Sequence, residues 1–157
     1  MNRRIFTFSA AAAALLLAGC GPTPQLKVKE AVLTLSPVDS NPSVMHFNVY
    51  GGPEDVHLLR VSSPSAVRVE MHDVAVDPKT GAVTMAPLDR VHIPAGEKIA
   101  FKKGGKHVMI WGVNVIPRRL GVIETEFLFS NNVRILVKAR VQEIDGSDPD
   151  EKKAIDG

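Results

Sequence analysis

The chain has one cysteine, few aromatic residues and little net charge. Cys20 is the only cysteine in 157 residues, which excludes an internal disulfide and a metal centre built from several thiolates. Aromatic residues make up 5% of the chain, which argues against a base-stacking surface. Arg3 and Arg4 account for the formal charge of +2, because the 19 basic residues without these two equal the 17 acidic residues in number. We therefore expect no nucleic acid partner.

Sequence motifs of enzymes are missing as well. The chain contains neither Gly-x-Ser-x-Gly nor His-Glu-x-x-His, the patterns of two large classes of hydrolase. The basic stretch 102–106 lacks the hydroxyl residue and the strand and helix context of a phosphate-binding loop. A blue-copper electron carrier needs a thiolate ligand, and Cys20 lies outside every predicted strand. We expect a protein that is not an enzyme.

The N-terminus has the pattern of a bacterial lipoprotein signal. Two arginines precede an apolar run over residues 10–17 that is too short to span a membrane. The segment ends in Leu-Ala-Gly-Cys, which resembles a lipobox with Cys20 as the lipidated residue. We predict a signal peptide over residues 1–19, a lipidated start and linker over 20–26, and a periplasmic protein anchored to a bacterial membrane. Gly21 follows in place of aspartate, which favours the outer membrane in a Gram-negative cell.

The remainder of the chain predicts a single all-β domain over residues 27–143. Short runs of alternating apolar and polar residues are separated by turn residues, and no segment has a helical apolar period. This spacing is typical of an antiparallel sandwich or barrel. Residues 144–157 are charged and poor in apolar side chains, so we expect a disordered tail. The predicted strands are 27–35, 44–50, 56–61, 67–76, 82–86, 98–101, 107–113, 122–129 and 133–141.

Two turns bring chemically interesting side chains together. The segment 78–81 ends in Gly81 and predicts a hairpin that pairs the strand of His72 with the strand of Met85. A Gly-Gly turn at 104–105 puts His107 at the start of its strand. Because neighbouring residues of a strand point to opposite faces, His107 and Met109 share one face, and Met71, next to His72, points into the core.

Two imidazoles and two thioethers are therefore available in one region: His72, Met85, His107 and Met109. Thioether sulfur binds soft Cu(I) without deprotonation, and imidazole is a suitable partner ligand. Zinc is the second choice, but zinc sites prefer cysteine, histidine and carboxylate ligands. The other three histidines, at positions 46, 57 and 92, are interpreted as surface or packing residues.

The same residues resemble the motif of the PCuAC periplasmic copper chaperones. That motif is a histidine, a methionine after a short hairpin, a 21-residue spacer and then His-x-Met, and the spacer from Met85 to His107 has this length. The flanking sequences Val-Ser-Ser-Pro at 61–64 and Ile-Pro-Ala-Gly at 93–96 also agree. The twelve residues between His72 and Met85 are more than is usual, which indicates a longer hairpin.

The resemblance implies a cupredoxin-like Greek-key fold and a copper-binding function. It implies that His72, Met85, His107 and Met109 bind Cu(I), and that a monomeric protein delivers the metal to a cytochrome c oxidase subunit or an assembly factor of that enzyme. The alternative is a metal-free β-sandwich lipoprotein that acts as a structural or protein-binding module.

Overall fold

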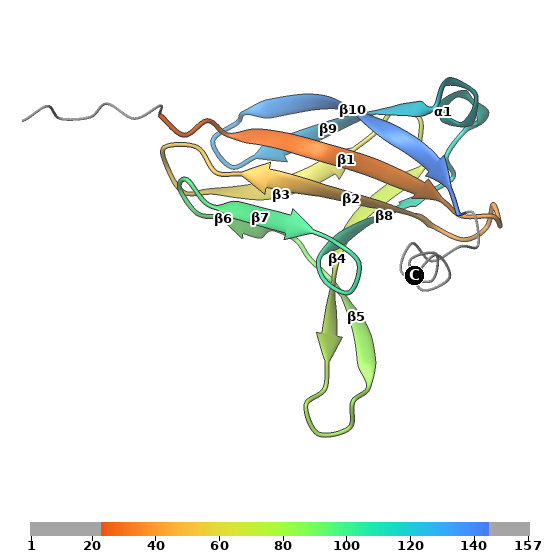
Figure 1. Ribbon diagram of the computed structural model, residues 1–157, viewed down its shortest axis with the longest axis horizontal. Helices are drawn as coiled ribbons and strands as arrows, with labels where there is room; N and C mark the ends of the chain where they lie inside the picture. The colour runs from red at the N-terminus through yellow and green to blue at the C-terminus, as the bar shows by residue number, and fades with distance from the viewer. Residues whose placement is uncertain (1–22, 145–157) are drawn as a thin grey trace, which may run out of the picture.

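The computed structural model describes residues 23–144 and consists almost entirely of β-strands (Figure 1). Its elements are β1 (Lys27–Leu35), β2 (Ser43–Tyr50), β3 (Val56–Ser62), β4 (Arg68–Val76), β5 (Val83–Pro87), β6 (Val91–Ile93), β7 (Lys98–Phe101), β8 (His107–Trp111), α1 (Val115–Leu120), β9 (Val122–Phe129) and β10 (Arg134–Glu143).

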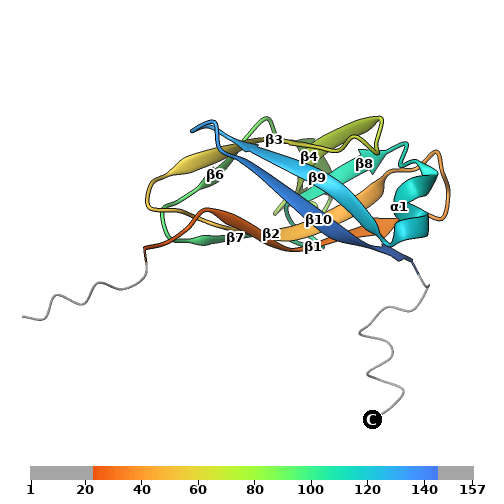
Figure 2. The same cartoon turned by 90° about the horizontal axis from the view of Figure 1, so that it is seen from above.

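The strands form one open, curled sheet. Their order is β5-β4-β8-β2-β1-β10-β9-β3-β6, and β7 pairs with the second half of β2. Figure 2 shows how the sheet curls so that β1, β2 and β7 lie on one side and β3 on the other. The predicted cupredoxin-like β-sandwich is thus confirmed. One neighbouring pair, β1 with β10, is parallel, whereas the other pairs are antiparallel.

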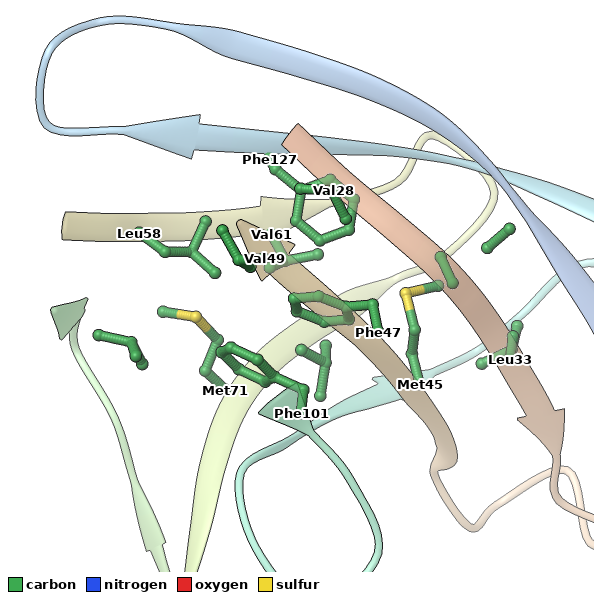
Figure 3. Close-up of a cluster of buried hydrophobic side chains, with 14 of the residues drawn as sticks. Val28, Leu33, Met45, Phe47, Val49, Leu58, Val61, Met71, Phe101 and Phe127 are labelled. Carbon is green, nitrogen blue, oxygen red and sulfur yellow. The ribbon is translucent and has the colours of Figure 1, made fainter. Parts of the chain in front are cut away.

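The core lies between the two layers and follows from strict alternation. In β2, Met45, Phe47 and Val49 are buried while the residues between them are half-buried. The Phe47 ring stacks on Phe101 with 4.2 Å between centroids and meets the edge of Phe127 at 4.8 Å. Figure 3 shows these rings among the aliphatic side chains of both layers. Because this face of β2 is fixed in the core, its other face is fixed outward.

Two short elements differ from the sequence prediction. β6 is a strand of three residues between the predicted strands 82–86 and 98–101, where no strand is predicted. Helix α1 lies between the predicted strands 107–113 and 122–129, where no helix is predicted. It is six residues long and has no apolar period to detect. Its ends are fixed instead by Asn114, whose side chain accepts a hydrogen bond from the Ile116 N–H, and by Gly121 at a φ of 69°.

The β4–β5 hairpin projects from the body of the sandwich (Figure 1). Every residue of β5 is exposed. The connecting loop closes through the Gly81 N–H, which donates to the Asp77 carbonyl oxygen at 2.9 Å, and Gly81 has a φ of 70°. The predicted hairpin and its glycine are confirmed.

The predicted signal peptide (residues 1–19), the predicted lipidation site Cys20 and residues 145–157 of the predicted tail lie outside the described residues. Within residues 23–144, no helix has the length and apolar character needed to cross a membrane.

Candidate metal centre

His72 and His107 face each other across the pairing of β4 with β8. They are register partners, and their ring centroids are 6.1 Å apart with 26° between the planes. The same register puts Glu70 opposite Met109 and Arg68 opposite Trp111. Because the residues of each strand alternate, these six side chains lie on the outer face of the sheet. The predicted shared face of His107 and Met109 agrees with this register.

His107 has one ring nitrogen committed to the protein. It is 6% exposed, and its Nδ1–H donates to the carbonyl oxygen of Gly105 at 2.8 Å. The glycine pair supplies this acceptor because Gly104 turns the chain back with a φ of 75°. A carbonyl oxygen only accepts hydrogen bonds, so the contact selects the tautomer with the proton on Nδ1. The Nε2 lone pair remains available for a metal.

His72 is arranged in a complementary way. Its Nε2–H donates to Oε2 of Glu70 at 3.1 Å, and the side chain is 14% exposed. Its Nδ1 is buried and has no hydrogen-bond partner among the described residues. A buried polar atom without a partner is costly in a folded protein, and a bound cation would satisfy it. The Glu70 carboxylate also lies 3.5 Å from the Arg68 guanidinium.

Met109 lies on the same strand as His107, half-buried and two residues further along. Its position is diagonal to His72, since Glu70 stands directly opposite. Diagonal neighbours on one face are about 7–8 Å apart at Cα, which long side chains can span.

Met85 is further out than the other three predicted ligands. It is 59% exposed on β5, and its register partner on β4 is Val74. The register partner of His72 is Pro87, which is two residues from Met85. Because residues two apart on a strand share a face, Met85 lies on the same face as His72 but is displaced along the hairpin. The structure therefore groups His72, His107 and Met109 on two adjacent strands and puts Met85 beside them on the third.

His46, interpreted from the sequence as a surface or packing residue, adds a third imidazole to this region. Val44 and Met45 pair with Met109 and Val108, and the next residue along β2 comes beside His107. Burial, and then the imidazole of His107, lower the pKa of His46. The residue is half-buried, and its position depends on pairing between β2 and β8, which are distant in sequence.

Two further contacts stabilise the surroundings. The Arg68 guanidinium lies 3.9 Å from the centroid of the Trp111 ring, a cation–π arrangement, and that ring is 6.5 Å from the ring of His72. The Lys106 ammonium bonds the Asp73 carboxylate at 2.9 Å and joins the turn before β8 to β4 beside the two histidines. Across residues 23–144, no group of three or more histidine, cysteine, aspartate or glutamate side chains is arranged to hold a metal ion.

Solved structures of PCuAC domains share this fold. The copper-bound PCuAC domain from PmoF2 aligns with a TM-score of 0.61 and 15% identity, over 77% of this chain and 95% of that domain. The apo PCuAC domain from PmoF1 aligns with a TM-score of 0.58 and 17% identity, over 77% and 96%. Apo-DR1885 from Deinococcus radiodurans aligns with a TM-score of 0.54 and 14% identity, over 94% and 100%. The PCuAC-type fold expected from the sequence is confirmed.

The family follows from the sequence itself. Residues 26–141 match the family described as "Putative lipoprotein LpqE-like", and this range holds all four predicted ligands. The chain belongs to the LpqE-like lipoprotein family. No curated protein matches the sequence.

Proposed function

We propose that this protein is a copper chaperone that binds Cu(I) through His72, Met85, His107 and Met109. The observation that carries the proposal is the hydrogen bonding of the two facing histidines. Each has one ring nitrogen bound to an oxygen acceptor, Gly105 O or Glu70 Oε2, and the buried Nδ1 of His72 has no hydrogen-bond partner among the described residues. Histidine ligands of metals have this arrangement, because the second contact orients the ring and sets its tautomer.

The methionines give the site its preference among metals. Thioether sulfur is neutral and soft, so it favours Cu(I) over the hard cations Mg²⁺ and Ca²⁺. Two imidazoles and two thioethers add no negative charge, which suits a monovalent ion. The copper-bound PCuAC domain from PmoF2 has the same fold, and this likeness supports copper as the cargo.

Exposure of Met85 fits a role in transfer rather than storage. It is 59% exposed at the projecting hairpin, whereas His107 is 6% exposed. An acceptor can replace the exposed thioether first while the buried imidazole still holds the metal. We infer stepwise ligand exchange, with a cytochrome c oxidase subunit or one of its assembly factors as the acceptor. No step in this transfer makes or breaks a covalent bond of a substrate, so the protein is a carrier and not an enzyme.

A lipid on Cys20 would hold the domain at a membrane on the periplasmic side, with the outer membrane favoured in a Gram-negative cell. Membership of a lipoprotein family supports the anchor. A carrier tethered in this way searches the membrane surface for its acceptor as a monomer.

The test is a Cu(I) titration of the full chain in mild detergent against a competing Cu(I) chelator. We expect one tightly bound Cu(I) per chain, and strongly weakened binding in the double variant Met109→Ala, His107→Ala. Lys102→Ala is the matched control, since it changes an exposed lysine of the turn before His107 without removing a ligand. Binding that is weak in the parent, or equal in parent and double variant, would favour the metal-free lipoprotein module instead.

A further inference from the structure

A second pair of histidines lies on a different part of the sheet. His57 on β3 and His92 on β6 are register partners, and their ring centroids are 5.2 Å apart. Val56 and Leu58, on either side of His57, are buried in the core, as are Val91 and Ile93. Alternation therefore fixes both imidazoles on the outer face, where they are accessible from solvent.

The backbone geometry puts these two residues in the closer of the two kinds of antiparallel pair. The His57 N–H donates to the Ser130 hydroxyl, and the His57 carbonyl accepts from the Ser130 N–H, both at 2.9 Å. Both backbone groups of one strand residue point to the same side, so those of His57 point away from β6. His57 and His92 thus form a non-hydrogen-bonded pair, the kind in which Cα atoms are only about 4.5 Å apart.

A carboxylate fixes the orientation of one of the rings. The His92 Nε2–H donates to Oδ2 of Asp55 at 3.1 Å, while Oδ1 of the same carboxylate accepts from the Ala95 N–H at 2.8 Å. Both oxygens of this carboxylate are thus engaged, and Oδ2 is the one that holds the His92 ring. The contact assigns the ring proton of His92 to Nε2 and leaves its Nδ1 lone pair free.

We infer that His57 and His92 form a second metal site, which takes a borderline divalent cation and binds Cu²⁺ most tightly. Imidazole nitrogen binds such cations at about 2.0–2.1 Å, so two nitrogens of one site lie at most about 4 Å apart. The ring centroids are 5.2 Å apart, so rotation of the His57 ring about its side-chain bonds meets this limit while Asp55 holds the His92 ring. Asp55 acts as a positioning residue through the carboxylate–histidine–metal arrangement, and water fills the remaining positions.

The donor set separates this site from the proposed Cu(I) centre. No methionine belongs to it, and a nearby carboxylate favours a divalent over a monovalent cation. Among divalent first-row metals Cu²⁺ binds nitrogen ligands most strongly. The inference does not depend on the proposed function, because the two sites share no residue.

The test uses the full chain in mild detergent with His72→Ala and His107→Ala, which removes the proposed Cu(I) centre. Cu²⁺ is titrated against glycine as a weak competing ligand, and electron paramagnetic resonance counts the bound nitrogens. We expect one Cu²⁺ per chain with two imidazole nitrogens. His57→Asn and His92→Asn should each weaken binding at least about tenfold, and Asp55→Asn by about tenfold.

His46→Asn in the same background is the matched control and should leave the affinity unchanged, since it removes an imidazole outside the pair. All these side chains are outside the core, and circular dichroism checks the fold of each variant. Equal Cu²⁺ affinity in the background and in folded His57→Asn, or a spectrum with a single nitrogen ligand, would overturn the inference. Loss of binding in His46→Asn alone would also overturn it.

Discussion

Replacing Glu70 by alanine isolates the contribution of a residue that binds no metal itself. Its carboxylate accepts the Nε2–H of His72 at 3.1 Å, and without it the ring is free to rotate and to change tautomer. Loss of such an orienting partner typically costs about 10- to 100-fold in metal affinity, or about 1.4 to 2.8 kcal/mol. The Glu70 side chain is 40% exposed and shared with Arg68. We therefore expect a loss near the lower limit, about tenfold.

The assay is competition for Cu(I) with a chelator, combined with nitrogen NMR of the His72 ring. Glu70→Gln keeps an acceptor oxygen and should lose less affinity than Glu70→Ala. Glu126→Ala is the matched control. Glu126 on β9 also forms an ion pair with an arginine, Arg134 on β10, at 2.9 Å, but it is not beside the two histidines. If folded Glu70→Ala kept the parent affinity and the Nε2–H tautomer, the argument that this hydrogen bond prepares His72 for a metal would be refuted.

Three other predictions concern the ligands, the anchor and pH. Met109→Ala and His107→Ala should each weaken Cu(I) binding at least about tenfold, roughly 1.4 kcal/mol, as measured by chelator competition. His72→Ala should weaken binding by the same factor or less. Parent-like Cu(I) binding by folded Met109→Ala would contradict this prediction. Cys20→Ser should remain unlipidated and leave the membrane fraction without losing copper affinity, and acylated, membrane-bound Cys20→Ser protein would contradict it. The pKa of Asp55 is lowered from 3.8 on folding, so its stabilisation is present above that value and is lost as the pH falls through the lower folded value. Urea titrations of the parent and of Asp55→Asn give the difference in their free energies of unfolding, which should therefore vanish in acid. A difference that grows in acid would contradict a stabilising role of the ionised Asp55 carboxylate.

The strands were predictable because alternation is a local signal. In β2 the pattern of buried and half-buried residues is strict over its whole length, and the predicted range differs from the observed one by a single residue. β6 was missed because three residues hold too little alternation to detect. The parallel pairing of β1 with β10 joins segments from the two ends of the domain, and no local pattern encodes such a partner.

The candidate site was predictable to the extent that it is local. His107 and Met109 lie on one strand, so their common face follows from spacing alone. Glu70 has the same two-residue spacing from His72, and this spacing alone indicates that the two side chains share a face. His46 reaches the site only through the pairing of β2 with β8, which requires the three-dimensional fold.

X-ray absorption of the Cu(I)-loaded full chain tests the central claim most directly, because it counts sulfur and nitrogen neighbours of the metal. Two nitrogen and two sulfur scatterers are expected for the parent. Met109→Ala should lose one sulfur, and His107→Ala should lose one nitrogen. A copper environment without sulfur, or one that is identical in the parent and in folded Met109→Ala, would contradict a site made of two histidines and two methionines.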